Sequence, residues 1–423
     1  MASPLGGIEM FNIKTAAVAA AALVASAGVA GAEKIEVTHW WTSGGEAAAV
    51  GVFADAVNAS GHEWVDGAIA GGGNARPVIL SRIAGGDPMG ATQLNTGRDA
   101  EDLVQAGLMT DLTDLAEAEG WADFIRPSKL LDSCTYEGRI YCVPVNIHSF
   151  QWMWLNRGAY ATAGVAVPTN WSEFEAAAPA LRDAGITPLA VGGEAWQISG
   201  MSGVFQVALG GLDLYRAINV DKSPEAAASA DMTKVFEAIA AARSMVDDGY
   251  VGRAWNDATA MVITGKAGAQ IMGDWAQGEF GVAGQTAGDE YDCLPGLGVY
   301  PVLDTGGDAF YFPKPTKNAD AMTAAQLEMA SLLVSKQVQV DFNLAKGSLP
   351  IRGDIDLSAA NDCMQKGLAI LENPDNVLPS SEQAFTGDTQ GQFEDLWVSF
   401  FNDPSISVED AQARYVEIVA SAD

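Results

Sequence analysis

Short β-branched runs alternate with stretches of helical periodicity over the first third of the chain. The run KIEVTHWW at residues 34–41 is typical of a first strand, and SGGE at residues 43–46 leads from it into an alanine-rich helical pattern. Similar units follow, with predicted helices at residues 78–84 and 99–106 and predicted strands at residues 91–94 and 139–145. Strands that alternate with helices predict an α/β fold with largely parallel sheets.

Longer helical patterns dominate the remainder of the chain, at residues 172–184, 232–248 and 321–340. After the N-terminal segment, about 390 residues remain, a length that suggests two domains. No internal repeat or low-complexity linker separates them. A chain that crosses several times between two lobes has no single linker, so we expect a connection made of several segments.

The N-terminus has the layout of a secretory signal peptide. Lys14 precedes an unbroken small and apolar stretch that ends in Ala30, Gly31 and Ala32. The stretch is shorter than the ~20 apolar residues that span a bilayer. We therefore predict that residues 1–32 are a signal peptide cleaved after Ala32, and that the mature protein is soluble in the periplasm. The first cysteine, Cys134, lies too far downstream for lipid attachment.

The charge balance excludes several partners. The chain has 23 basic and 54 acidic residues, a formal charge of −31, and the mature part keeps this charge. Without a basic face it has nothing to neutralise phosphates, so we expect no binding to nucleic acid or to anionic lipid. The three histidines are scattered and there is no C-x-x-C sequence, so we expect no metal site.

The four cysteines are expected to form two disulfides, because the chain leaves the reducing cytosol. Three pairings are possible in principle. A Glu-Gly turn lies midway in CTYEGRIYC, as in a short hairpin. We therefore predict bonds between Cys134 and Cys142 and between Cys293 and Cys363.

Tryptophan is unusually abundant, with 11 residues, several of them in polar sequence contexts. The adjacent Trp40 and Trp41 should point their rings to opposite faces, so that one ring can meet solvent or a ligand. We expect Trp41 at the end of the strand to be that ring, outside the core. For the other tryptophans, packing in the core or between lobes is the alternative. Aromatic rings stack on the apolar face of a pyranose, and carboxylates, amides and ammonium groups bind its hydroxyls.

Four long motifs carry a resemblance to a known family. They are VTHWWTSGGEAAAV at 37–50, VPVNIHSFQWMWLN at 143–156, WNDATAMVITGKAGAQIMGDWAQGEF at 255–280 and KGSLPIRGDID at 346–356. In these motifs, and over essentially the whole mature chain, the sequence resembles the periplasmic glucose-binding proteins of bacterial ABC transporters. These proteins belong to the sugar-binding group that contains maltose-binding protein.

The resemblance implies an α/β, two-lobed periplasmic binding protein fold, each lobe a β-sheet flanked by helices, with a multi-segment hinge. Residues 33–143 and 304–346 would form the N-terminal lobe, and residues 144–303 and 347–423 the C-terminal lobe. A monosaccharide, glucose by resemblance, would bind in the cleft and pass to the permease subunits of an ABC transporter. No cofactor and no partner subunit are implied, so we expect a monomer.

The same resemblance assigns a set of ligand-binding residues. Trp40 and Trp41 would stack on the sugar, and Trp275 would form a second wall of the site. The polar contacts would be made by Glu46, Asp308 and Lys346. Two positions depart from the glucose-binding pattern: Asn95 stands where a basic residue is frequent, and Gln383 lies near the place of a frequent histidine. Both can bind hydroxyls, but they leave the sugar epimer open.

Structural alternatives exist for the polar candidates. Glu46 could simply stabilise the positive end of the helix that follows, Lys346 could be an exposed cation at a helix end, and Asp308 could be a turn residue. His148 is expected in the hinge or core.

The sequence leaves two alternatives to monosaccharide binding. The same fold could bind a disaccharide or a polyol. A secreted glycosidase would need two carboxylates across one bond, and no motif singles out such a pair. There is also no G-x-S-x-G, H-E-x-x-H or P-loop sequence, so we expect a binding protein and not an enzyme.

Overall fold

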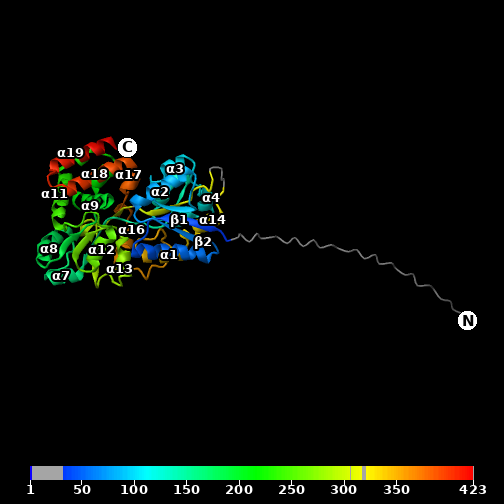
Figure 1. Cartoon of the computed structure of the whole chain (residues 1–423), viewed down its shortest axis with the longest axis horizontal. Helices are drawn as coiled ribbons and strands as arrows, with labels where there is room; N and C mark the ends of the chain where they lie inside the picture. Colours follow the sequence, from blue (N-terminus) through cyan, green and yellow to red (C-terminus); the bar gives the residue numbers. More distant parts are fainter. Residues whose placement is uncertain (2–31, 305, 317–320, 423) are drawn as a thin grey trace. The chain divides into compact units, whose positions relative to one another are not determined.

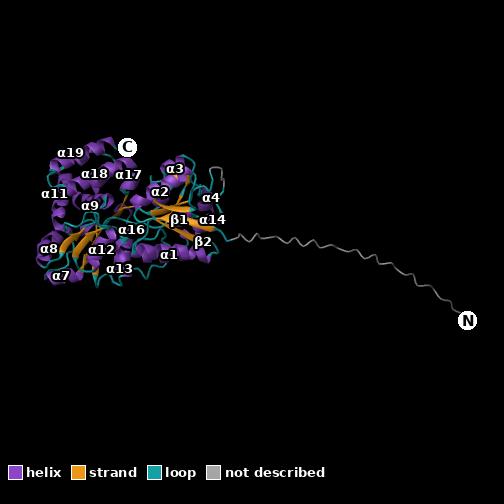
Figure 2. Cartoon of the chain, in the orientation of Figure 1, coloured by secondary structure: helices purple, strands orange, loops and turns teal. Residues whose placement is uncertain are grey.

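The computed structural model describes residues 1, 32–304, 306–316 and 321–422. The predicted signal peptide lies outside these residues except for Met1 and Ala32. From Ala32 onward the chain contains two main β-sheets, and Figures 1 and 2 show that each has its own set of helices. None of the described helices, including the 25-residue α9, is long and apolar enough to cross a membrane.

The first sheet has five strands in the order β2-β1-β3-β12-β6. β1 pairs in parallel with β2 and β3, whereas β12 is antiparallel to β3 and β6. The strands are β1 (Lys34–His39), β2 (Glu63–Ala68), β3 (Ala91–Asn95), β6 (Cys142–Pro144) and β12 (Asp308–Tyr311). The helices of this lobe are α1 (Gly44–Ala59), α2 (Gly72–Gly85), α3 (Glu101–Gln105), α4 (Thr113–Glu119), α5 (Trp121–Phe124), α6 (Ser128–Asp132), α14 (Ala324–Leu333) and α15 (Lys336–Lys346).

The second sheet has four strands in the order β10-β7-β9-β8. β8 and β9 are parallel, and β7 is antiparallel to both β9 and β10. The strands are β7 (Trp152–Asn156), β8 (Thr187–Ala190), β9 (Ala267–Ile271) and β10 (Tyr291–Pro295). The helices here are α7 (Arg157–Ala163), α8 (Trp171–Asp183), α9 (Ala195–Asn219), α10 (Pro224–Ala227), α11 (Ala230–Ala242), α12 (Trp255–Ile263), α13 (Ala276–Val282), α16 (Asp362–Leu371), α17 (Ser381–Ala384), α18 (Gly387–Asn402) and α19 (Val408–Ser421).

Both sheets are mixed: most strands of each run in one direction, as expected, but neither sheet is purely parallel. In each sheet a single strand runs against the others, β12 in the first and β7 in the second. β7 follows β6 without an intervening helix, and only a 3₁₀ turn and the short β11 (Leu303–Asp304) separate β10 from β12. Each of these two strands therefore enters its sheet directly from the other lobe.

Three segments connect the lobes: residues 145–151, the stretch between β10 and β12, and the stretch between α15 and α16. They are hydrogen-bonded to one another. The Ile147 and Leu349 backbones exchange bonds of 2.7 and 3.0 Å, and His148 N donates to Gly306 O at 3.1 Å. This arrangement explains why the sequence has no single linker.

Several predicted elements occur where expected. The predicted helix at 78–84 lies within α2, the strand at 91–94 matches β3, and the helix at 172–184 matches α8 within one residue at each end. The predicted helix at 99–106 is present only as the five residues of α3.

Other predicted elements are divided. The strand predicted at 139–145 is two strands, because β5 (Arg139–Ile140) pairs with β4 (Thr135–Tyr136) whereas β6 pairs with β12. The helix predicted at 321–340 is interrupted by the extended backbone of Ser335, between α14 and α15. The helix predicted at 232–248 ends as α11 and a 3₁₀ turn that stops at Met245.

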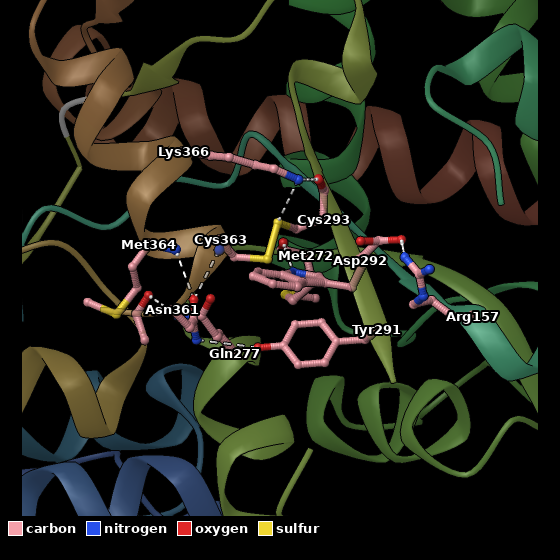
Figure 3. Close-up of a disulfide and its surroundings, with 12 residues drawn as sticks. Arg157, Met272, Gln277, Tyr291, Asp292, Cys293, Asn361, Cys363, Met364 and Lys366 are labelled. Atoms are coloured by element: carbon pink, nitrogen blue, oxygen red, sulfur yellow. Dashed lines mark hydrogen bonds and ion pairs between the residues drawn. A yellow bond between two sulfur atoms is a disulfide. The ribbon is translucent and has the colours of Figure 1, made fainter. Parts of the chain in front are cut away.

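Both predicted disulfides are present. Cys134 and Cys142 enclose the β4–β5 hairpin, whose turn residues Glu137 and Gly138 have positive φ. Figure 3 shows the second bond, between Cys293 on β10 and Cys363 in the first turn of α16. The bond therefore fixes the chain beyond the third crossing to the second sheet.

Candidate ligand-binding site

A cleft of about 750 Å³ is lined by residues of both lobes. In the first lobe they follow the carboxyl ends of β1, β2 and β3, and in the second they follow β8 and β9. Open α/β sheets bind ligands at this edge, because the loops there are free to carry polar side chains. The rest of the lining comes from the crossing segments, from β12 and from helices α9, α12, α15, α17, α18 and α19.

Seven of the eight predicted site residues line this cleft: Trp40, Trp41, Glu46, Asn95, Trp275, Asp308 and Lys346. The eighth, Gln383, does not. It lies in α17 and lines a separate hollow beside Tyr311 and the Cys134–Cys142 disulfide. The resemblance placed Gln383 by its sequence neighbourhood, and the helical turn of α17 carries its side chain elsewhere.

A buried ion pair lies at one side of the cleft. Lys346 Nζ is 3.1 Å from Glu46 Oε1, and the two side chains are only 2% and 9% exposed. Ser43 Oγ donates to Glu46 Oε2 at 3.0 Å. Lys346 is therefore not an exposed helix-end cation. Glu46 lies in the first turn of α1, as the helix-end interpretation expects, and it also lines the cleft.

Asp308 is the centre of a second buried polar cluster, and it begins β12 instead of forming a turn. Its Oδ1 accepts from Gln93 Nε2 at 2.8 Å, and its Oδ2 accepts from Asn146 Nδ2 at 2.9 Å and lies 3.1 Å from His148 Nδ1. Burial alone would raise the pKa of Asp308, but these hydrogen bonds and the nearby His148 and Lys346 hold it below its usual range. Asp308 is thus an ionised acceptor.

Two other acids near the crossing segments behave differently from Asp308. Burial raises the pKa of Asp274 to about 8, and it also raises the pKa of Asp304. The backbone amides of Ser149 and Phe150 donate to Asp274 Oδ2 and Asp304 Oδ1 at 3.1 and 3.0 Å. Asp304 lines the cleft, whereas Asp274 is not among the lining residues.

Aromatic rings of the second lobe form a wall of the cleft. The ring of Trp275 lies 5.4 Å from Phe150, 6.1 Å from Trp196 and 5.0 Å from His148, measured between centroids. All four residues line the cleft and the two indoles are partly exposed to it. Such a surface suits the C–H face of a sugar ring.

The adjacent tryptophans do not divide their roles as expected. Trp41 is 1% exposed and packs on Phe53 and Phe342 at 6.2 and 5.5 Å. The expectation that it lies outside the core is therefore wrong, although it still contributes to the lining. Trp40 is the partly exposed ring, and the Arg76 guanidinium stacks on it at 4.6 Å.

Several lining residues were not selected from the sequence. Trp196 stood in a polar context and could have been chosen for it. Three consecutive glycines after β2 signal a close backbone approach, and Gly71 has a φ of 80° that favours glycine. Arg76 and Asp304 gave no signal, because their position at the cleft depends on tertiary packing alone.

The donor set fits a polyhydroxylated ligand. Stacking faces, several carboxylates, an ammonium group and amides converge on one cleft, which is the composition of a small-ligand site. Within the described part of the chain, no group of His, Cys, Asp or Glu is arranged to hold a metal ion.

The sequence matches both a protein family and full-length relatives. The profile of the family described as bacterial extracellular solute-binding protein matches residues 63–330. A "Probable sugar-binding periplasmic protein" of Brucella suis biovar 1 is 36% identical over 425 residues, which cover 98% of this chain and 99% of the relative.

Solved structures extend the likeness to the fold. A bacterial solute receptor, AcbH, described by its exclusive preference for β-D-galactopyranose, superposes with a TM-score of 0.75 at 18% identity, over 92% of this chain and 98% of its own. Maltose-bound MalE3 of T. maritima superposes with a TM-score of 0.73 at 18% identity, over 92% and 99%. The predicted two-lobed α/β fold class is confirmed.

Proposed function

Because the chain belongs to the bacterial extracellular solute-binding proteins, we propose that it captures a monosaccharide, glucose, and delivers it to an ABC-type importer. The observation that carries the proposal is the cleft, in which the aromatic wall around Trp275 accompanies the buried polar groups Asp308, Lys346 and Glu46. A sugar ring needs both kinds of surface, one for its C–H face and one for its hydroxyls.

The mechanism that we propose is capture by closure of the two lobes. Residues 33–143 with 304–346 and residues 144–303 with 347–423 would move about the crossing segments. The protein would work as a monomer in the periplasm after removal of residues 1–32, without a cofactor and without catalysis. Permease subunits of the importer would recognise the closed form.

A disaccharide is the second candidate ligand, and the size of the cleft favours it. A hexose has about twelve non-hydrogen atoms, and even at the ~30 Å³ that a water molecule takes in the liquid they would fill roughly 360 Å³. The cleft measures about 750 Å³. The space beyond one ring could hold a second ring, a polyol chain or water.

A thermal-shift panel of monosaccharides, disaccharides and polyols separates these candidates. A ligand at about a hundred times its dissociation constant stabilises the folded state by ~2.7 kcal/mol. We expect the largest rise in melting temperature with glucose. A rise with disaccharides alone would replace the proposed ligand, and sugar turnover in the same incubation would replace binding with catalysis.

A matched pair of lysine variants tests whether the glucose-induced rise in melting temperature arises from binding in the cleft. Lys346→Met removes the buried ammonium and should abolish most of the glucose-induced rise. Lys234→Met removes an ammonium that is 62% exposed on α11 and should keep it. Equal responses from the two variants would contradict the placement of the site.

A further inference from the structure

Two of the crossing segments and the stretch that follows the short β13 (Val377–Leu378) lie side by side at the floor of the cleft, and each supplies a polar residue to its lining. These residues are Gln151 from the first crossing segment, Asp304 from the second, and Ser380, which follows β13 in the second lobe. Asp304 pairs with Leu378 in a two-stranded ladder, and the Ser149 hydroxyl accepts from the backbone amides of both Gln151 and Asp304.

Glycine allows this close approach. A Cβ added at Gly306 would lie 3.2 Å from His148 O and 3.7 Å from Ser380 Cβ. The second crossing segment therefore contacts both Ser380 and His148 of the first segment, and His148 in turn contacts Asp308. The floor is continuous with the polar cluster already described.

Two of the floor residues have side-chain oxygen atoms that form no hydrogen bond with other described residues of the protein. Gln151 and Ser380 are 2% and 6% exposed, and neither Gln151 Oε1 nor Ser380 Oγ has a hydrogen-bond partner among the described residues. Ser380 is the N-cap of α17, yet its hydroxyl does not bond to that helix. Serine at this position normally accepts from a backbone amide of the first turn.

Buried polar atoms without a partner are costly, and they persist where something else completes them. We infer that Gln151 and Ser380 are ligand-binding residues whose side-chain oxygens bind hydroxyls of the captured sugar. This assignment rests on the proposed function and extends its site from the lobe surfaces to the hinge. Because Gln151 belongs to the first crossing segment and Ser380 lies against Gly306 of the second, their bonds would connect ligand binding with the segments about which the lobes close.

The test uses Gln151→Met and Ser380→Ala, which replace polar atoms with apolar ones of similar or smaller size. The matched control is Tyr160→Phe, because Tyr160 OH is also buried and unpartnered, but it lies in α7 within the second-lobe core and outside the cleft. We measure glucose affinity by calorimetry and the melting temperature of each unliganded protein.

Each floor variant should bind glucose about tenfold more weakly or worse, with an unliganded melting temperature that is not lowered, because a buried unpaired group has been removed. Tyr160→Phe should match the wild type in affinity. If buried water is the only partner of these oxygens, both floor variants will keep their affinity, and the inference is overturned. A wild type that binds no sugar of the panel overturns the proposed function itself and this inference with it.

Discussion

Replacing Asp308 with asparagine removes one charge and keeps the size of a side chain that is fully enclosed. Its oxygens face three donors, on Gln93, Asn146 and His148. An asparagine amide group would point toward at least one of them. Gln93 cannot turn its own amide without losing the bond that its Oε1 accepts from Trp40 N at 3.0 Å. One buried donor therefore stays unpaired whichever way the new side chain is oriented.

The expected cost of Asp308→Asn is about 3 kcal/mol in the free energy of unfolding near pH 7. Hydrogen bonds to charged groups contribute ~1.5–3 kcal/mol each, and a buried unpaired donor costs a further ~1–3 kcal/mol, part of which relaxation recovers. Urea denaturation followed by tryptophan fluorescence measures the difference. Asp354→Asn is the control, because Asp354 is 44% exposed and its ion pair with Arg352 should contribute no more than ~1 kcal/mol.

The pH dependence checks the same reasoning. The pKa of Asp308 is depressed in the folded protein, so its stabilisation is fully present above the unfolded value of ~4 and is lost as pH falls toward the folded value. The difference between wild type and Asp308→Asn should therefore shrink below about pH 4. A cost under ~1 kcal/mol at neutral pH, or a cost that does not shrink in acid, would refute the account of this cluster.

Three further predictions follow from burial and pairing. Trp41→Ala should lower the free energy of unfolding by about 3–5 kcal/mol in urea denaturation, because Trp41 is in the core. Trp275→Ala should mainly weaken sugar binding, about tenfold in calorimetry. The reverse pattern would mean that Trp41 lines the cleft without supporting the core. Replacing Cys293 and Cys363 together with serine should cost about 2–4 kcal/mol in urea denaturation, and an unchanged midpoint would contradict this. Burial raises the pKa of Asp274 to about 8, so the wild type loses free energy of unfolding as pH rises from ~4 to 8, where the unfolded chain ionises this group more readily than the folded one. Asp274→Asn should therefore be more stable than wild type by a few kcal/mol at pH 8 and differ least near pH 4. A difference in unfolding free energy that does not change with pH would count against this.

Local patterns predicted the elements whose stability is local. The alanine-rich run after Ser43 became α1, with the Ser43 side chain as its N-cap. The cysteine pair around a Glu-Gly turn became the β4–β5 hairpin. In both cases the decisive contacts join residues close in sequence, where turn and capping chemistry act.

Features that depend on distant contacts were not accessible in the same way. Lys346 and Glu46 are 300 residues apart, so their burial as a pair could not be read from either sequence context. Trp41 is covered by residues of α1 and α15, and only that packing makes it a core residue. The mixed sheets depend on how β7 and β12 enter, which strand periodicity does not encode.

The site shows the same division. Of the seven assigned residues that line the cleft, five lie in the long motifs and two, Asn95 and Asp308, lie outside them, whereas Gln383, also outside these motifs, lines the separate hollow. Arg76 and Asp304 reach the cleft only through the fold, and no residue pattern distinguishes them from solvent-exposed charges.

Calorimetric titration of the mature protein with D-glucose tests the central claim most directly. We predict a single site with a dissociation constant of micromolar or below, about −8 kcal/mol or stronger. No heat with glucose, galactose or mannose, beside a clear signal with a disaccharide, would contradict monosaccharide binding, and no heat with any sugar would contradict the proposed function altogether.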